Sequence, residues 1–336
     1  MSRGTITITV KILKIASFVL LLVGIALYFN IGTHLYQKEL RQSRSIDRES
    51  DLKRLQAAYD DVDTALLFIG YPRSRHTIVS AILDAHPNIM LSNEMNLIGT
   101  YGRFPGMSKT EMFDKITALS YRLATKGRRS LTMQGNATFY VKTGYKVPNQ
   151  WQGTFDGTLK ILGDKVGWFT AAYLAKESGR SLLKQIEDDY NLKAKFIHVI
   201  RNPFDNIATL AMRLLGLRTG EHTQKHNISK EIDSSIKRYF GIAGNCQATK
   251  EAFGDRVLDI IGEDFVRDPP KHLRKICDFL EITCTEDYIH DCSSIIDPVP
   301  SMTRSFVVWT PEQIKTVYTS MQSLEFLQKQ SYTFES

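Results

Sequence analysis

The sequence predicts an α/β fold: a single domain in which helices flank a central parallel sheet, preceded by an N-terminal membrane helix. Two observations predict the domain. Short apolar segments rich in β-branched residues alternate with helical segments, and this order is typical of a parallel sheet covered by helices on both faces. The length also fits one large domain with short appendages. The expected strands are 66–69, 89–91, 159–162, 196–200 and 257–261.

A third observation concerns the N-terminus. Residues 15–31 are almost entirely apolar and follow several basic residues. This run is at the short end of the range for a membrane-spanning helix. A cleaved signal peptide is the alternative, but the sequence has no convincing small-x-small cleavage site, and residues 23–26 form a poor one. We therefore expect a tail at 1–14, a retained signal anchor at 15–31, a polar and charged stem at 32–63, and the folded domain at 64–336.

The first strand of the domain is followed by the turn Gly70-Tyr71-Pro72-Arg73-Ser74-Arg75-His76-Thr77 and then by an apolar-periodic helix. A strand–loop–helix unit gathers backbone N–H groups and the positive end of a helix dipole, which suits a phosphate or sulfate group. The signature of a nucleoside-triphosphate P-loop is absent, because Arg75 and His76 replace its second Gly and its Lys. The loop is therefore expected to hold an anion other than ATP with magnesium.

Two further segments have the same strand–turn–helix order. Apolar residues 194–200 end at Arg201, Pro203 suits a first helical turn, and Thr209 would lie about two turns along that helix. Residues 257–269 form the last expected strand, an acidic turn and an Asp-Pro pair, followed by a helix over 273–280.

These three segments, in this order, resemble the sulfotransferases. The loop 72–77 stands where the family has roughly Pro-Lys/Arg-Ser-Gly-Thr-Thr, with Arg75 and His76 at the usual Gly and Thr. Residues 81–88 resemble the Golgi-type membrane-bound branch, including the tyrosylprotein sulfotransferases. The resemblance spans about 64–300. It implies a P-loop-like sulfotransferase fold, 3'-phosphoadenosine 5'-phosphosulfate (PAPS) as donor, no metal, and a type II Golgi membrane protein with a lumenal domain and a cytoplasmic tail.

The resemblance also assigns a donor site. The 5'-phosphosulfate is expected to contact loop residues Arg73, Ser74, Arg75, His76 and Thr77. Arg201, together with Thr209 at the family's Ser position, is expected to bind the 3'-phosphate. Arg304, in a late basic loop, is expected to reach a phosphate, with a surface arginine as the alternative.

Three residues are candidates for catalysis. Glu94 follows the expected strand 89–91 at the same spacing from Arg73 as the catalytic Glu of the tyrosylprotein enzymes, and it is the candidate base. The alternative is a Glu that complements a helix dipole. Lys165, in a turn after the expected strand 159–162, is the candidate cation for the bridging oxygen. Arg73 is expected to contact the sulfuryl oxygens. Weaker rivals to Lys165 are Lys146 and Lys160.

The aromatic residues and cysteines leave alternatives open. Trp151 and Trp168 flank the Lys165 turn and would line an acceptor cleft or belong to the core. Cys284 can pair with Cys292, or Cys277 with Cys284. The remaining Cys246 is expected to be buried and free. Two N-glycosylation sequons, at 136–138 and 227–229, are compatible with a lumenal domain.

The formal net charge is +7, which favours an anionic donor or an acidic acceptor and is equally typical of a solvated basic surface. A nucleic-acid-binding motif is missing from the sequence, so we expect no nucleic-acid partner. The expected function is transfer of a sulfuryl group from PAPS to a hydroxyl of a glycan or protein. A catalytically silent nucleotide-binding protein and a P-loop kinase are the alternatives.

Overall fold

A computed structural model describes residues 47–127, 131–134, 137–140, 144–217, 225–330 and 332–335. Two compact units are distinguished, 1–57 and 58–336. The described part of the first unit, residues 47–57, belongs to helix α2 (Asp47–Ala58). The expected anchor at 15–31 and the sequon residue Asn136 lie outside the described residues. Within the described ranges, no helix has the length and apolar character needed to cross a membrane.

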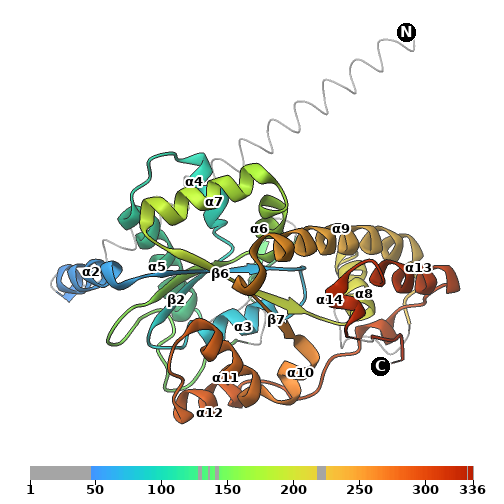
Figure 1. Ribbon diagram of the computed structural model, residues 1–336. Coiled ribbons are helices and arrows are strands. Elements are labelled where there is room, and N and C mark those ends of the chain that lie inside the picture. Colours follow the sequence, from blue (N-terminus) through green and yellow to red (C-terminus); the bar gives the residue numbers. More distant parts are fainter. Residues whose placement is uncertain are drawn as a thin grey trace, which may run out of the picture. The chain divides into compact units, whose positions relative to one another are not determined.

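The second unit is built on the five-stranded parallel sheet that the sequence predicts (Figure 1). Its strand order is β2-β5-β1-β6-β7. The strands are β1 (Thr64–Ile69), β2 (Ile89–Asn93), β5 (Ile161–Lys165), β6 (Lys193–Ile200) and β7 (Val257–Ile261). All four pairings in this sheet are parallel. Strand β5 begins two residues later than expected. A separate antiparallel hairpin joins β3 (Leu131–Gln134) to β4 (Ala137–Tyr140).

The buried strands explain why the sheet is parallel. Every residue of β1 is buried, as are seven of the eight residues of β6. Such continuous apolar runs require cover on both faces, which crossover helices provide. In Figure 1, α6 (Gly167–Leu174), α7 (Glu177–Tyr190) and α9 (Ser229–Phe253) lie on one face of the sheet. On the other face lie α3 (His76–Leu83), α11 (Pro269–Leu280) and α12 (Glu286–Ser294).

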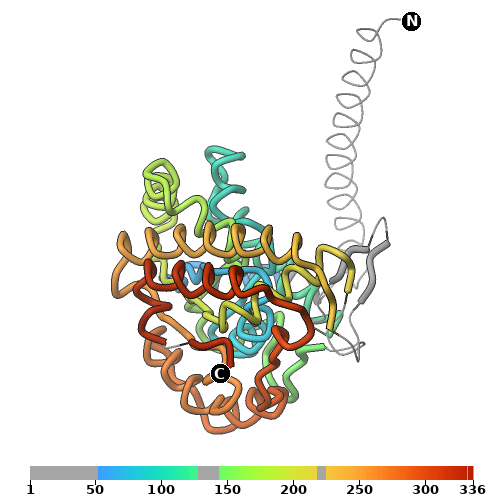
Figure 2. The backbone as a smooth tube through the Cα atoms, turned by 90° about the vertical axis from the view of Figure 1, so that its right-hand side faces the viewer, coloured from blue at the N-terminus to red at the C-terminus, as the bar shows by residue number. Residues whose placement is uncertain are grey.

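The remaining helices surround this sandwich. They are α4 (Leu97–Arg103), α5 (Lys109–Thr125), α8 (Pro203–Leu214), α10 (Gly262–Arg267), α13 (Pro311–Met321) and α14 (Glu325–Gln328). Figure 2 shows α13 running alongside α9. Gln313 at the start of α13 bonds to Ser229 and Asp233 of α9, which fixes the C-terminal region against the domain.

The structure decides between the two disulfide pairings that the sequence left open for Cys284. A disulfide joins Cys277 to Cys284, with the Cα atoms 6.1 Å apart. Helix α11 ends at Leu280, and Glu281 takes a left-handed conformation with φ 57° that turns the chain back toward the helix. Cys292 instead lies in the core on α12, where its thiol contacts the Ile82 carbonyl. Cys246 is buried and free, as predicted.

Candidate functional site

The candidate base and the candidate cation meet at the carboxyl edge of the sheet. Strands β2 and β5 are neighbours, and Asn93 is paired with Lys165. The next residue, Glu94, donates its backbone N–H to the Lys165 carbonyl, and its carboxylate lies 2.9 Å from the Lys165 Nζ. The Lys165 side chain is 7% exposed and the Glu94 side chain 66% exposed. A buried ammonium therefore holds an accessible carboxylate where parallel sheets bind ligands.

Asp164 organises the turn that carries Glu94, a role that the sequence reasoning missed. Glu94 and Asn96 both have positive φ, 63° and 60°, which is unusual for residues with a Cβ. The buried Asp164 carboxylate accepts hydrogen bonds from the backbone N–H groups of Met95 and Asn96, at 3.0 and 2.8 Å. Burial raises the pKa of Asp164, and the hydrogen bonds from Ser92 and the turn oppose that shift. The signal was an acidic residue inside an otherwise apolar strand.

The donor loop that joins β1 to α3 spans residues 70–75 and has an unusual backbone; it is two residues shorter than expected, because His76 and Thr77 form the start of α3. Gly70 has φ 132°, and Arg73 and Arg75 have φ 69° and 66°. Arg75 therefore adopts the left-handed conformation although it replaces the family's Gly. Arg73 is exposed, Ser74 is buried with its hydroxyl donating to the Tyr71 carbonyl at 2.8 Å, and Thr77 is half-buried. Strained backbone of this kind clusters at functional sites in proteins.

His76 lies beneath the loop. Its ring is buried against two glycines, because a Cβ on Gly70 or Gly167 would come within 2.8 or 2.7 Å of that ring. Burial, followed by the nearby charge of Lys165, lowers the pKa of His76 well below its ordinary value. The imidazole is therefore neutral near pH 7 and supports the loop from inside.

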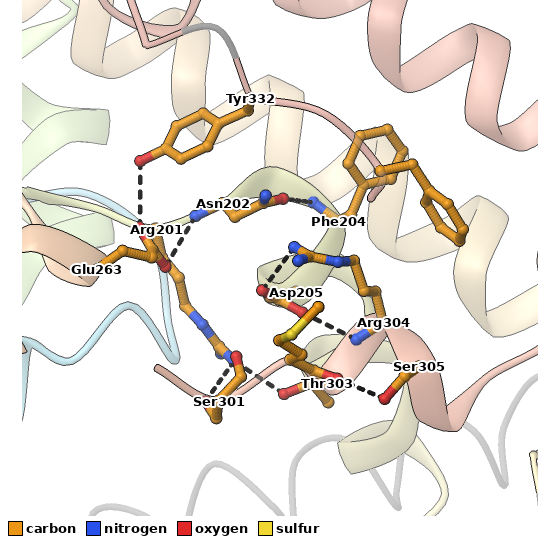
Figure 3. A network of polar contacts seen from close by, with 12 residues as sticks. Arg201, Asn202, Phe204, Asp205, Glu263, Ser301, Thr303, Arg304, Ser305 and Tyr332 are labelled. Carbon is orange, nitrogen blue, oxygen red and sulfur yellow. Dashed lines mark hydrogen bonds and ion pairs between the residues drawn. The ribbon is translucent and has the colours of Figure 1, made fainter. Parts of the chain in front are cut away.

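Arg75 turns away from the loop toward an acidic partner. Its guanidinium lies 3.2 Å from the Glu263 carboxylate, and both side chains are largely buried. Glu263 also accepts hydrogen bonds from the Asn202 backbone and from the Tyr332 hydroxyl (Figure 3). One carboxylate, which the sequence reasoning did not single out, thus joins the donor loop, the loop after β6 and the C-terminal segment.

Arg201 directly follows β6 and lies beside the donor loop, because β6 and β1 are neighbours. Its guanidinium donates to the Arg73 carbonyl at 3.1 Å and to the Thr209 hydroxyl at 2.9 Å. It also donates to the Ser301 and Thr303 hydroxyls (Figure 3). The predicted pair Arg201 and Thr209 is therefore in direct contact. Ser301 and Thr303 join it from a part of the chain that the sequence reasoning used only for Arg304.

Arg201 is a buried cation with neutral partners. The side chain is 4% exposed, and within the described part of the chain its bonds all go to hydroxyl or carbonyl oxygens. Its Nε atom is buried without a hydrogen-bond partner in that part of the chain. Burial, together with the charge of Arg75, lowers the pKa of Arg201 to about 10, and the nearby Asp205 and Glu263 carboxylates, which do not bond to it, partly oppose that shift. Because buried charges are normally paired, this position is suited to an incoming anion.

Arg304 differs from Arg201 in having its charge matched. Its guanidinium lies 2.9 Å from the Asp205 carboxylate, and its backbone N–H donates to the same carboxylate (Figure 3). Both side chains are almost fully buried. This ion pair fastens the short 3-10 helix 303–306 to the first turn of α8. Arg304 thus holds the loop that carries Thr303 against Arg201.

The two tryptophans lie at opposite edges of the sheet. Trp168 is the second residue of α6 and lies three residues after Lys165, which ends β5 and is not in the expected turn. Trp168 is 36% exposed and stacks on Phe169 with ring centroids 3.7 Å apart. The backbone N–H of Trp151 donates to the carbonyl of Ala85, which precedes β2. Trp151 also lines a cavity of about 240 Å³. Only Trp168 is therefore placed to meet an acceptor at the candidate site. Lys160 precedes β5 at the far edge, and Lys146 is exposed.

The buried histidines make stability depend on pH. Burial lowers the pKa values of His76, His86 and His198 in the folded state. Below an unfolded-state pKa of about 6.5, the unfolded chain binds more protons, so the free energy of unfolding should fall as the pH drops. Urea unfolding at pH 7.5, 6.5 and 5.5 measures this slope. His76→Gln should make the free energy of unfolding depend less on pH, and the surface control His290→Gln should leave that dependence unchanged. Equal slopes in all three proteins would contradict the expectation.

Part of this site lies in a segment that is similar to a known protein family. Residues 193–287 match the family model described as "Sulfotransferase family". This segment is sulfotransferase-like. It includes Arg201, Thr209, Glu263 and the disulfide, and it ends before the loop that carries Ser301 and Thr303. A search of curated proteins finds no match.

Several solved structures of sulfotransferases are similar to the chain. One is a mouse sulfotransferase in complex with PAP (adenosine 3',5'-bisphosphate), with 13% identity and a TM-score of 0.45. The match covers 85% of this chain and 93% of the mouse chain. A Mycobacterium avium sulfotransferase has 12% identity and a TM-score of 0.42, with coverages of 82% and 81%. The sulfotransferase domain of a Synechococcus olefin synthase has 17% identity and a TM-score of 0.40, with coverages of 77% and 94%.

Proposed function

We propose that the domain is a PAPS-dependent sulfotransferase that transfers a sulfuryl group to a hydroxyl of a glycan or protein acceptor. The observation that carries this proposal is Arg201. It is a buried guanidinium with an unpaired Nε and no carboxylate among its described hydrogen-bond partners, and it lies where two strand–loop–helix units meet. The sulfotransferase match over 193–287 supports the same reading.

The residues present fit a nucleotide that carries two anionic groups. Arg201 and Thr209 would hold the 3'-phosphate. Backbone N–H groups of the loop 70–75, that of Ser74 included, would hold the 5'-phosphosulfate at the N-terminus of α3 together with the side chains of Arg73 and Thr77. Within the described residues, no cluster of His, Cys, Asp or Glu is suited to a metal ion. The anions would thus be bound by side-chain cations and backbone amides.

The catalytic roles follow from the Glu94–Lys165 pair. When bound, the donor supplies an activated sulfuryl group for in-line displacement by a hydroxyl. Glu94 is exposed and held by Lys165, so its carboxylate is available to accept the proton of an acceptor hydroxyl. Lys165 and Arg73 would stabilise negative charge on the bridging and sulfuryl oxygens. Trp168 would border the acceptor.

Two other functions are distinguished by particular residues. A P-loop kinase needs a cation where His76 stands, but that imidazole is buried with its pKa lowered, and it points under the loop. A silent nucleotide-binding protein is favoured by one observation, the pairing of Arg75 with Glu263, which turns a loop cation away from the expected donor. Such a protein would bind nucleotide and transfer nothing.

The proposal predicts that adenosine 3',5'-bisphosphate (PAP) stabilises the protein without added metal. Ligand binding to the folded state raises the melting temperature by mass action. Thermal unfolding is measured with PAP, with and without a chelator, and we expect the same increase in both. The absence of any increase in either condition contradicts the proposed function. An increase that the chelator removes would instead favour a metal-dependent nucleotide site.

We further propose a lumenal Golgi location, with residues 15–31 as a type II membrane anchor. The Cys277–Cys284 disulfide supports an oxidising compartment. The sequon residue Asn227 is exposed and therefore accessible to glycosylation. Sensitivity of the domain to protease in intact microsomes would contradict a lumenal location.

A further inference from the structure

A chain of polar side chains, two of them completely buried, connects three adjacent strands beneath the donor loop. Asp259 of β7 contacts the Nδ1 atom of His198 of β6 at 3.0 Å. The Nε2 atom of the same ring lies 3.3 Å from the hydroxyl of Tyr71, which follows β1 in the donor loop. The side chains of His198 and Tyr71 are completely buried. None of these three residues has a role in the proposed chemistry.

The charges in this chain fix the direction of its hydrogen bonds. Burial alone would raise the pKa of Asp259, but bonds from His198 and Lys250 lower it to about 2. Burial lowers the pKa of His198, so its ring is neutral near pH 7. The Asp259 carboxylate therefore accepts a hydrogen bond from the Nδ1–H group, which leaves a lone pair on Nε2. That lone pair accepts the hydrogen bond donated by the Tyr71 hydroxyl.

Tyr71 is the anchor of a strained loop. It follows Gly70, with φ 132°, and precedes Arg73 and Arg75, which both have left-handed backbone. Its carbonyl accepts the Ser74 hydroxyl, and its ring stacks on Tyr239 with centroids 4.3 Å apart and planes 17° apart. Such backbone persists only when surrounding contacts hold it. The hydroxyl, the ring and the carbonyl of this one residue therefore all restrain the loop.

We propose that Asp259, His198 and Tyr71 form a positioning relay that holds the donor loop in its anion-binding conformation. The His198 and Tyr71 side chains are completely buried and Asp259 reaches the loop only through them, so the relay acts through the loop and touches neither donor nor acceptor. This inference rests on the proposed function for its purpose, which is binding of the 5'-phosphosulfate. The effect of the relay on the conformation of the loop is expected whether or not the protein is a sulfotransferase.

The first test therefore needs no ligand. Amide hydrogen exchange is followed over residues 70–77 in wild type and Tyr71→Phe, which removes only the hydroxyl. One neutral hydrogen bond is worth about 1 kcal/mol, so we expect exchange in this segment to become about fivefold faster. The matched control is Tyr288→Phe, another fully buried tyrosine, whose hydroxyl donates to the Ile82 carbonyl at 2.9 Å. It should leave exchange in 70–77 unchanged.

His198→Gln tests whether the effect passes through the imidazole. It should also accelerate exchange in 70–77, and the double variant with Tyr71→Phe should add little to either single change. Fully additive effects would overturn the relay, as would equal exchange in Tyr71→Phe and Tyr288→Phe. If the histidine variant does not fold, the two tyrosine variants still decide the outcome.

Nucleotide affinity separates the relay from the proposed function. With Tyr71→Phe, affinity for 5'-AMP should fall about fivefold, and affinity for 3'-AMP, which lacks the 5'-phosphate, should stay as in wild type. An equal loss for both nucleotides would indicate a general structural role and overturn the positioning role. If exchange responds as expected but wild type binds neither nucleotide, the relay stands and the sulfotransferase function fails.

Discussion

Glu94→Gln should reduce the rate of sulfuryl transfer by about 10²- to 10⁴-fold, the usual contribution of a general base. The amide keeps the shape of the side chain and its hydrogen bond to Lys165 but removes the basic lone pair. Affinity for PAP should stay close to that of wild type, because Glu94 is not among the residues assigned to the donor. Single-turnover transfer at saturating PAPS, on an acceptor found by screening glycans and peptides, measures the loss in kcat.

The chain provides a matched control. Glu281 also has left-handed backbone, with φ 57°, and its exposed carboxylate also pairs with a buried lysine, Lys195, at 2.6 Å. Glu281→Gln therefore removes the same kind of ion pair away from the site and should leave transfer unchanged. Near wild-type turnover in Glu94→Gln, with complete loss in Lys165→Ala, would place the base elsewhere. If wild type transfers to no acceptor but binds PAP, the silent-binding function replaces catalysis.

Arg201→Ala should weaken binding of PAP by roughly 10- to 150-fold, since a hydrogen bond to a charged group is worth about 1.5–3 kcal/mol. The physical reason is the loss of a buried guanidinium that has no compensating carboxylate among its described bonds. Binding of 5'-AMP, which lacks the 3'-phosphate, should change little. Isothermal titration calorimetry with the two nucleotides gives both affinities directly.

Arg256→Ala is the control for loss of a partly buried arginine. Its guanidinium pairs with Glu187 and donates to the Ala194 carbonyl, away from the donor loops. It should alter the affinity of neither nucleotide. Equal losses for PAP and 5'-AMP in Arg201→Ala would show that Arg201 acts on the fold of the loops, and its assignment to the 3'-phosphate would then be wrong.

Local patterns predicted most of the sheet. Each strand of the sheet contains a short apolar run, and for the inner strands burial on both faces is enough to specify such a run without knowledge of its neighbours. The helix after the loop 70–75, the position of Glu94 after β2 and that of Arg201 after β6 follow from the same local reading. The sequence also placed these residues at one edge, since parallel strands share their carboxyl ends.

The contacts of the charged side chains could not be predicted in the same way. Arg75 and Arg304 looked like free cations for phosphate, yet Glu263 and Asp205 pair with them from 188 and 99 residues away. Arg201 looked equivalent and is the one whose described bonds go only to neutral oxygens. Whether a buried cation is compensated depends on which carboxylate the fold brings near, and long-range proximity leaves no local pattern in the chain.

The sequence by itself thus determined the five strands of the parallel sheet, the loops after β1 and β6 and the residues at their ends, because these depend on local hydrophobicity and turn chemistry. Only the tertiary structure decided the rest. It paired Cys277 with Cys284 through the left-handed turn at Glu281, buried His76 under the donor loop, and joined Glu94 to Lys165 by inserting β5 beside β2. Each of these outcomes depends on which segments become neighbours, which is set by the packing of the whole domain.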